Sequence, residues 1–368
     1  MARKANVVLS EDDDDAPIDS DPVCLLCGFD IKIMQSIAVT NTTFPGVAFE
    51  EKQWKIYIRT RRKYVLVPSR EVENTYFYKY PRLWTAACRA IIKGPNTKHY
   101  LTGINILRFD GGCCRYVPRD PHLACIGTKS EDPEFDNSFV HYYTAEIGRQ
   151  RKWLIGYQCG YSVHAHCWVL LDRVFDGGTE FVEAHLERFI RAARKYWRDH
   201  KSLYGSSNWG RQFCGGPPLT FMKCFYGCDI YQNPAVDPKV RRLIEQARKT
   251  KAKPSHLCSQ FMRVSLDVAT LIAEQLCPVN YTVADIKNIR NMLAAFQWVL
   301  PECFWSARCR RDVIFELGDI KEIDPINWGA LQLDLMTLLI DGKSGLSNRA
   351  RIIGVITSIK SIYFSMRK

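Results

Sequence analysis

Two short pairs of metal-binding side chains, far apart in the chain, constrain most strongly how these 368 residues can fold. The first pair is Cys24 and Cys27, followed directly by Gly28. Two residues between cysteines let both thiolates reach one tetrahedral ion, and the glycine permits the turn that aims backbone amides at sulfur. The second pair is His164 and Cys167, whose spacing places both side chains on one face of a turn or helix. Together the pairs complete a four-ligand site that would tie the two segments together.

The sequence therefore predicts a structural Zn²⁺ ion held by these three thiolates and one imidazole. His166 is a rival to His164 as the imidazole ligand. A further half-site would hold a second Zn²⁺ in a cross-braced, RING-like arrangement, with Cys159 as an additional ligand; its residues are Cys113, Cys114, His122 and Cys125. The alternative is that these thiols are simply buried, because cysteine is among the residue types most often found in protein cores.

The charge of the chain is unevenly distributed. The net charge is +12, yet residues 1–21 carry seven acids against two bases, which leaves −5 in this segment and +17 in the rest. We expect the acidic segment to be a disordered tail, because its run of like charges cannot be buried. The basic remainder favours an acidic partner or nucleic acid. The candidate nucleic-acid contacts are Arg59, Arg61, Arg62, Lys63 and the 248–253 cluster, but no motif that reads nucleic acid accompanies them.

The cysteine content indicates a reducing compartment. The chain has 15 cysteines, and its first residues lack the apolar core of a signal peptide. No window approaches the ~20 apolar residues of a membrane span. We therefore expect a cytoplasmic or nuclear protein, in which cysteines are metal ligands or buried thiols. Cys88, Cys277 and Cys303 lie in apolar helical patterns and are predicted to be core residues.

Local patterns predict both strands and helices in the first part of the chain. Strand-forming runs of β-branched and aromatic residues occur at 54–58, 64–67 and 101–107. Residues 82–93 have the pattern of a helix, and a long helix is predicted from Thr179 to about Leu203. The apolar face of that long helix is formed by Val182, Leu186, Phe189, Ala193 and Trp197. Pro238 fits the first turn of a further helix.

These elements predict an α+β fold, with a mixed α/β domain that contains the zinc site followed by an all-α region. The predicted boundaries are 1–21 for the acidic tail, 22–231 for the Cys/His-rich domain, 232–262 for a linker, 263–306 for a group of short helices and 307–368 for a C-terminal helical extension. In 263–306, two amphipathic stripes begin at Leu266 and after Asp285. Such stripes are typical of a small helical bundle.

The order of residues in 263–306 resembles a fungal F-box. The matching residues are Leu266, Ile272, Leu276, Asp285, Ile286, Phe304 and Trp305. Similar proteins continue with segments like Ile326-Asn327-Trp328 and Gly345-Leu346-Ser347-Asn348-Arg349, and carry a CxxCG pair and an HxxCW pair near their N-terminus. Ser265 stands where the F-box proline is expected, and the link 277–284 is longer than usual.

The resemblance implies an F-box-like adaptor that catalyses no reaction. Its box helices would dock on the Skp-type adaptor of a cullin ubiquitin ligase, while the rest of the chain holds a protein substrate. The apolar anchors implied by the resemblance are Leu266, Val268, Ile272, Leu276 and Ile286. Two alternatives stay open: a RING-like zinc ubiquitin ligase, and a basic nucleic-acid-binding protein. The sequence contains no H-E-x-x-H, P-loop or G-x-S-x-G motif, so an enzyme is not expected.

Overall fold

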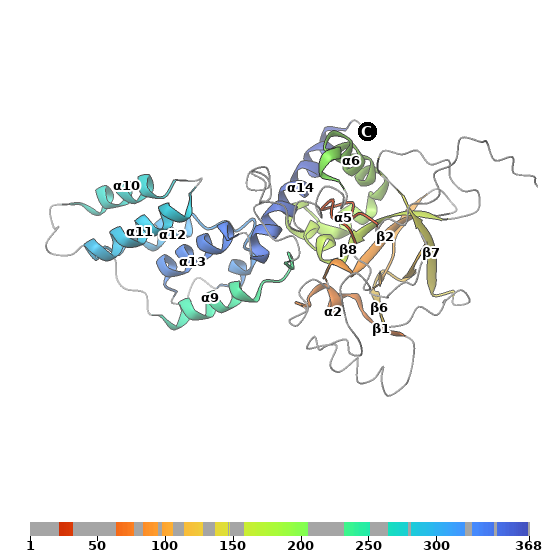
Figure 1. Ribbon diagram of the computed structural model, residues 1–368, viewed down its shortest axis with the longest axis horizontal. Helices are drawn as coiled ribbons and strands as arrows, with labels where there is room; N and C mark the ends of the chain where they lie inside the picture. The colour runs from red at the N-terminus through yellow and green to blue at the C-terminus, as the bar shows by residue number, and fades with distance from the viewer. Residues whose placement is uncertain are drawn as a thin grey trace, which may run out of the picture.

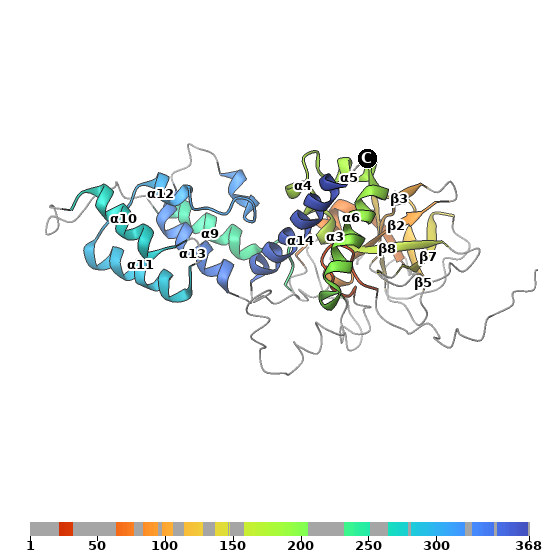
Figure 2. The ribbon, with the colours of Figure 1, turned by 90° about the horizontal axis from the view of Figure 1, so that it is seen from above.

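The protein consists of a mixed sheet domain, a helical arm and one long helix, α14 (Gly345–Ser365), that connects them (Figure 1). The computed structural model describes residues 22–31, 64–76, 84–94, 98–105, 114–127, 137–145, 147, 158–204, 232–250, 264–278, 281–320, 326–341 and 344–366. Seen from above, α14 again runs from the arm to the sheet domain (Figure 2). The predicted α+β class, with an N-terminal sheet and C-terminal helices, is confirmed.

The described residues of the sheet domain form one sheet of eight strands. Its order is β1-β6-β4-β2-β8-β7-β5, and β3 pairs with β2. The strands are β1 (Tyr64–Pro68), β2 (Cys88–Lys93), β3 (His99–Leu101), β4 (Ile104–Asn105), β5 (Cys114–Pro118), β6 (Leu123–Gly127), β7 (Phe139–Thr144) and β8 (Cys159–His164). The β4–β6 and β7–β8 pairs are parallel, and the other pairs are antiparallel. β2 and β8 therefore lie side by side at the centre of the sheet.

Strand β2 corrects the prediction of a helix at 82–93. Its register with β8 runs from Cys88 opposite His164 to Ile92 opposite Gly160. The first five residues of β2 are buried, because the sheet is covered on both faces at this point. A strand buried on both faces shows a continuous apolar run, and periodicity cannot distinguish such a run from a buried helix.

The other strand predictions had mixed outcomes. The strand predicted at 64–67 is confirmed as β1. The one predicted at 101–107 is replaced by the end of β3 and the two-residue β4, with residues 106 and 107 outside the described part. The one predicted at 54–58 also lies outside the described residues.

Short helices follow β8 and cover one face of the sheet. They are α3 (Ala165–Trp168), α4 (Leu171–Val174), α5 (Gly178–Ala184), α6 (Leu186–Asp199) and η2 (Lys201–Leu203), and α2 (Ser69–Glu73) follows β1. The long helix predicted from Thr179 is thus interrupted at His185, between α5 and α6. Its predicted apolar face is correct, because all five of its side chains are buried in one large core.

The helical arm begins inside the segment that was predicted to be a linker. Its elements are α9 (Pro238–Lys249), α10 (Leu266–Leu276), α11 (Val283–Phe296), α12 (Glu302–Ser306), η4 (Phe315–Asp319) and α13 (Trp328–Ile340). Val240, Ile244 and Ala247 on α9 are buried in a core shared with α13 and η4. This part of 232–262 is therefore a packed helix, because its apolar residues recur at helical spacing and find a partner surface.

Side-chain caps define the starts of α9, α10, α11 and α13 in the arm. Asp237 caps α9, Ser265 caps α10, and Thr282 forms a capping box with Asp285 at α11. The Ile326-Asn327-Trp328 segment provides Asn327 as the cap of α13.

No described helix combines enough length and apolar character to cross a lipid bilayer.

Arg349, from the Gly345–Arg349 segment, organises the arm from within α14. Its side chain is fully buried. It donates hydrogen bonds of 2.8 Å to both carboxylate oxygens of Glu316. It also donates to the backbone carbonyls of Pro234 at 2.6 Å, Val313 at 3.0 Å and Ala235 at 3.1 Å. One guanidinium thus joins α14, η4 and the segment that leads into α9.

Candidate metal centre

The first half of the candidate metal centre is a short turn, residues 22–31, which we call the knuckle. Cys24 and Cys27 are both fully buried. The turn is closed by hydrogen bonds from Gly28 N to Cys24 O at 3.0 Å and from Cys24 N to Phe29 O at 2.9 Å. Gly28 has φ +69, a left-handed conformation that favours glycine. The prediction that a glycine after the pair turns the backbone is consistent with this geometry.

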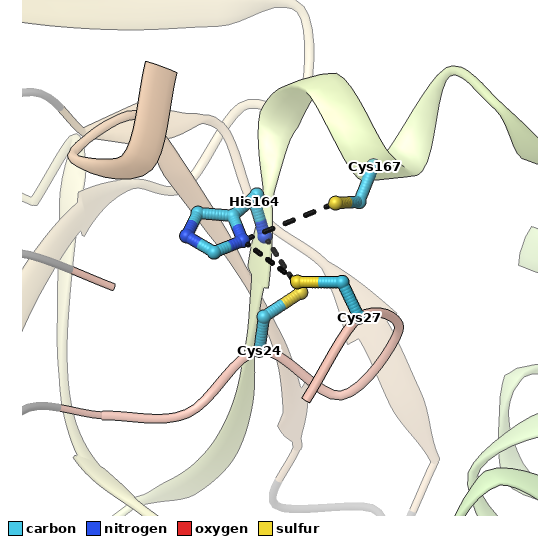
Figure 3. A group of neighbouring side chains, drawn as sticks. All are labelled: Cys24, Cys27, His164 and Cys167. Atoms are coloured by element: carbon cyan, nitrogen blue, oxygen red, sulfur yellow. Dashed lines mark hydrogen bonds between the residues drawn. The ribbon is translucent and has the colours of Figure 1, made fainter. Parts of the chain in front are cut away.

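The second half of the centre is the junction of β8 and α3. His164 ends β8 and Cys167 lies one turn later in α3, so the change from strand to helix brings both side chains to the same side. His164 Nε2 lies 3.2 Å from the carbonyl oxygen of Thr85, and Trp84 packs against the imidazole with ring centroids 4.8 Å apart. These contacts orient the ring so that its Nδ1 faces the cysteines (Figure 3).

The four side chains come together from these two segments, as the sequence predicts. His164 Nδ1 lies 3.3 Å from Cys27 Sγ and 3.9 Å from Cys167 Sγ. All four ligand atoms lie within 4.8 Å of one another. A tetrahedral zinc ion with bonds of about 2.3 Å to sulfur and 2.0 Å to nitrogen would require S···N separations of about 3.5 Å and S···S separations of about 3.8 Å. The cluster therefore has the composition and dimensions to hold one metal ion.

Two thiols of the cluster have pKa values shifted in opposite directions. Burial raises the pKa of the Cys24 thiol, but hydrogen bonds from Cys167, Cys27 and the backbone N–H of His164 outweigh it and hold that pKa well below its usual range. Burial raises the pKa of Cys167, and its interactions with the Cys24 and Cys27 sulfurs raise it further. Without a cation, the buried group favours a thiolate at Cys24 and a protonated thiol at Cys167. A divalent cation would offset the repulsion between neighbouring thiolates and allow all three sulfurs to ionise.

Backbone contacts from distant helices support the knuckle. Trp197 on α6 donates from Nε1 to the carbonyl oxygen of Leu25 at 2.7 Å. Arg351 on α14 donates from Nη1 to the carbonyl oxygen of Cys27 at 2.9 Å. Leu25 N also donates to Ser162 O of β8 at 2.9 Å. Trp197 and Arg351 could not be assigned to this site from the sequence, because their contacts depend on segments more than 150 residues away.

His166, the alternative imidazole ligand, contacts a different part of the protein. Its Nε2 lies 3.1 Å from the carbonyl oxygen of Thr75. Burial lowers its pKa to about 4, which keeps the imidazole neutral. The group of side chains that could hold a metal ion contains His164 and not His166.

No second metal cluster is present among the residues that the structure describes. Of the predicted half-site, His122 is exposed in a turn and Cys125 is buried in β6, where burial raises the pKa of its thiol. Cys113 and the side chain of Cys114 lie outside the described part. Cys159 is half-buried at the start of β8 and does not join the four-residue cluster.

The other cysteine predictions are confirmed at two positions and wrong at one. Cys88 and Cys277 are buried, as expected. Cys303 is exposed on α12, because the buried face of that short helix is formed by Phe304 and Trp305.

The predicted partner anchors divide into core and surface residues. Ile286 is buried in the core of the arm, and Leu266 and Leu276 are half-buried. Val268 and Ile272 are 45% and 38% exposed on α10. Leu271 on the same helix is 58% exposed and is a surface residue that the anchor prediction omitted. Partner binding by these residues stays a prediction.

The charged segments singled out in the sequence are mostly outside the described residues. These include the acidic tail 1–21 and the basic residues Arg59, Arg61, Arg62 and Lys63. In the cluster 248–253, Arg248 and Lys249 form the exposed last turn of α9.

Comparison with protein-family models, curated proteins and solved structures finds no match to this chain.

Proposed function

We propose that this protein is an F-box-like adaptor, which binds a Skp-type subunit of a cullin ubiquitin ligase through α10 and presents a protein substrate without catalysing a reaction itself. The observation that carries the proposal is an exposed apolar surface on α10, formed by Val268, Leu271 and Ile272, which we call the α10 patch. These residues are three and four positions apart, so they share one helical face. Val283 at the start of α11 is also exposed, at 69%.

The two faces of α10 have different roles. Ala269 and Ala273 are fully buried and hold the helix against the core of the arm. The buried face of α10 thus includes small alanine side chains, while the larger side chains of Val268, Leu271 and Ile272 are exposed to solvent. Four of the six large hydrophobic side chains exposed in the described residues are on α10 and α11. Apolar anchors repeated at helical spacing suit docking of a helix into an apolar groove, and burial of such side chains contributes on the order of 1–2 kcal/mol each.

Co-purification of the full-length chain with the Skp-type adaptor tests the proposal. We expect the wild-type protein to retain the adaptor and the double variant Val268→Glu/Leu271→Glu to lose it, because charged side chains cannot enter an apolar groove without a large desolvation cost. Leu66→Glu is the matched control, since Leu66 is equally apolar and 38% exposed but lies on β1. Equal circular dichroism spectra would show that all three proteins are folded. Retention by the double variant, or no retention by wild type, would refute adaptor binding through this surface.

We further propose that the metal centre binds one structural Zn²⁺ ion. Three thiolates and one imidazole occupy all four positions of a tetrahedral ion, which leaves no open position for a substrate or a reactive water. The complete burial of the four ligands supports the same assignment. The reducing cytoplasm or nucleus, where we propose that the protein acts, would keep these thiolates available.

Metal analysis of the purified protein tests the zinc proposal. We expect about one equivalent of zinc, which is lost in the Cys24→Ser/Cys27→Ser variant because two of four ligands are removed. Cys303→Ser is the matched control, because this cysteine is exposed and lies outside the cluster. Zinc content unchanged by the double substitution would rule out this site. Two equivalents, together with ubiquitin transfer that needs no cullin, would favour the RING-like alternative instead.

A further inference from the structure

We propose that the metal centre is the docking platform for α14, so that metal occupancy determines how firmly the helical arm is held against the sheet domain. Arg351 is the positioning residue that transmits this coupling. The inference rests on the proposed metal binding but is independent of adaptor binding. It follows from two sets of contacts, at the knuckle and along α14.

The first set of contacts attaches α14 to the backbone of the metal-binding turn. Arg351 is buried, and its Nη1 donates to the carbonyl oxygen of Cys27, a ligand-bearing residue. Its Nε and Nη2 donate to Asn348 Oδ1 at 3.2 and 3.0 Å. Asn348 in turn donates from Nδ2 to the carbonyl oxygen of Gln232 at 2.8 Å. A continuous polar chain therefore runs from the metal-binding turn to the segment that leads into α9.

The second set of contacts makes the same helix part of both domains. Arg349, two residues before Arg351, is bound to Glu316 and to the carbonyls at the base of the arm. The following turns of α14 pack into the large core of the sheet domain through Ile352, Val355, Ile356, Ile359 and Tyr363. A shift of α14 relative to the knuckle would therefore move the arm with it. Both ribbon views show α14 in this connecting position (Figures 1 and 2).

The metal would hold the Cys27 carbonyl more firmly than the protein contacts of the knuckle do by themselves. Residues 22–31 contain no helix, and their single β-bridge joins Val23 to Asp30. A loop of this kind depends on its ion for much of its stability. The metal therefore fixes the acceptor that Arg351 uses.

This coupling must be reciprocal. If metal binding strengthens the contact between Arg351 and the Cys27 carbonyl, then that contact must strengthen metal binding by the same factor. Residues that support metal ligands from outside the coordination shell typically change metal affinity by about 10- to 100-fold when they are replaced. We therefore expect Arg351→Gln to weaken zinc binding by about 10-fold or more.

Chelator competition on the full-length protein tests this inference. We would measure zinc affinity for wild type, Arg351→Gln, Arg351→Lys and Arg188→Gln. Arg188→Gln is the matched control, because Arg188 donates to the carbonyls of Tyr363 and Met366 at the other end of α14 and does not contact the knuckle. We expect weaker zinc binding in Arg351→Gln, a smaller loss in Arg351→Lys, which keeps the cation, and no change in Arg188→Gln.

Hydrogen exchange measured by mass spectrometry provides the second readout. In zinc-bound Arg351→Gln, we expect faster exchange in residues 345–356 of α14 than in wild type, while β2 and β8 keep their protection and show that the domain is folded. In the metal-free proteins this difference between wild type and variant should disappear, because the knuckle no longer holds its carbonyl in place. If wild type binds zinc but Arg351→Gln changes neither its affinity nor the exchange of α14, the coupling is refuted and the zinc proposal stands. If wild type binds no zinc, both fail, and adaptor binding is unaffected.

Discussion

Replacement of Arg349 by methionine should destabilise the helical arm by about 3–5 kcal/mol, which is the cost of removing one partner of a buried ion pair. The Arg349 side chain is fully buried and the Glu316 side chain is 8% exposed. Methionine fills part of the same volume but donates no hydrogen bond. The Glu316 carboxylate would then be buried without its cation, and the carbonyls of Pro234, Ala235 and Val313 would lose a donor. A loss of this size is a large fraction of the 5–15 kcal/mol that stabilises a typical protein.

Urea unfolding followed by circular dichroism measures this loss, with Arg290→Met as the control. Arg290 pairs with Asp334 at 2.7 Å, but both side chains are more than 40% exposed, and such surface pairs contribute only about 0–1 kcal/mol. The double variant Arg349→Met/Glu316→Leu removes the stranded carboxylate and should recover part of the stability. A cost of Arg349→Met no larger than that of Arg290→Met would refute the assignment of Arg349 as the organising residue of the arm.

Three further predictions concern the knuckle and α10. Gly28→Ala should lower both the thermal midpoint and the zinc affinity, because its Cβ would clash with the Trp197 ring at a positive φ. Gly354→Ala on α14 should lower neither, because a Cβ there meets no atom within 4 Å. Ser265→Ala should cost about 1 kcal/mol in urea unfolding, because it removes the α10 cap. Zinc affinity should fall as the pH falls, because burial raises the pKa of Cys167 and its proton must leave when zinc binds. Calorimetry in two buffers of different ionisation enthalpy should detect this proton release, and its absence would contradict the assigned protonation.

The metal cluster is the part of the structure that the sequence predicts best. Ligand spacing is a local property, and the chemistry of a tetrahedral ion restricts which pairs can meet, so the Cys24–Cys27 pair could be assigned to the second pair across 137 residues. The choice between His164 and His166 could not be made in this way. It depends on the carbonyls of Thr85 and Thr75, which fix each ring in the folded protein.

Long-range contacts explain what the sequence did not predict. β2 was predicted to be a helix because its apolar run lacks the alternation that only a half-exposed strand shows. The Gly345–Arg349 segment was recognised as a motif, but the role of Arg349 depends on Glu316 and on carbonyls more than 100 residues earlier. The cap residues Thr282 and Ser265 are local features whose residue types favour a helix start. Helix α11 nevertheless begins at Val283, before Asp285, after which its apolar stripe was predicted.

The distance along the chain between the knuckle and the residues that contact it has a consequence for synthesis. Cys27 accepts its hydrogen bond from Arg351, 324 residues later in the chain. At about 5–20 residues per second, the ribosome would need roughly 15–65 s to reach Arg351 after making Cys27. Until His164 is made, 137 residues after Cys27, the first two thiols have no partner segment, and they depend on the cell to keep them from oxidation or from binding the wrong metal. The nascent chain is therefore most vulnerable at the residues that are most deeply buried once it has folded.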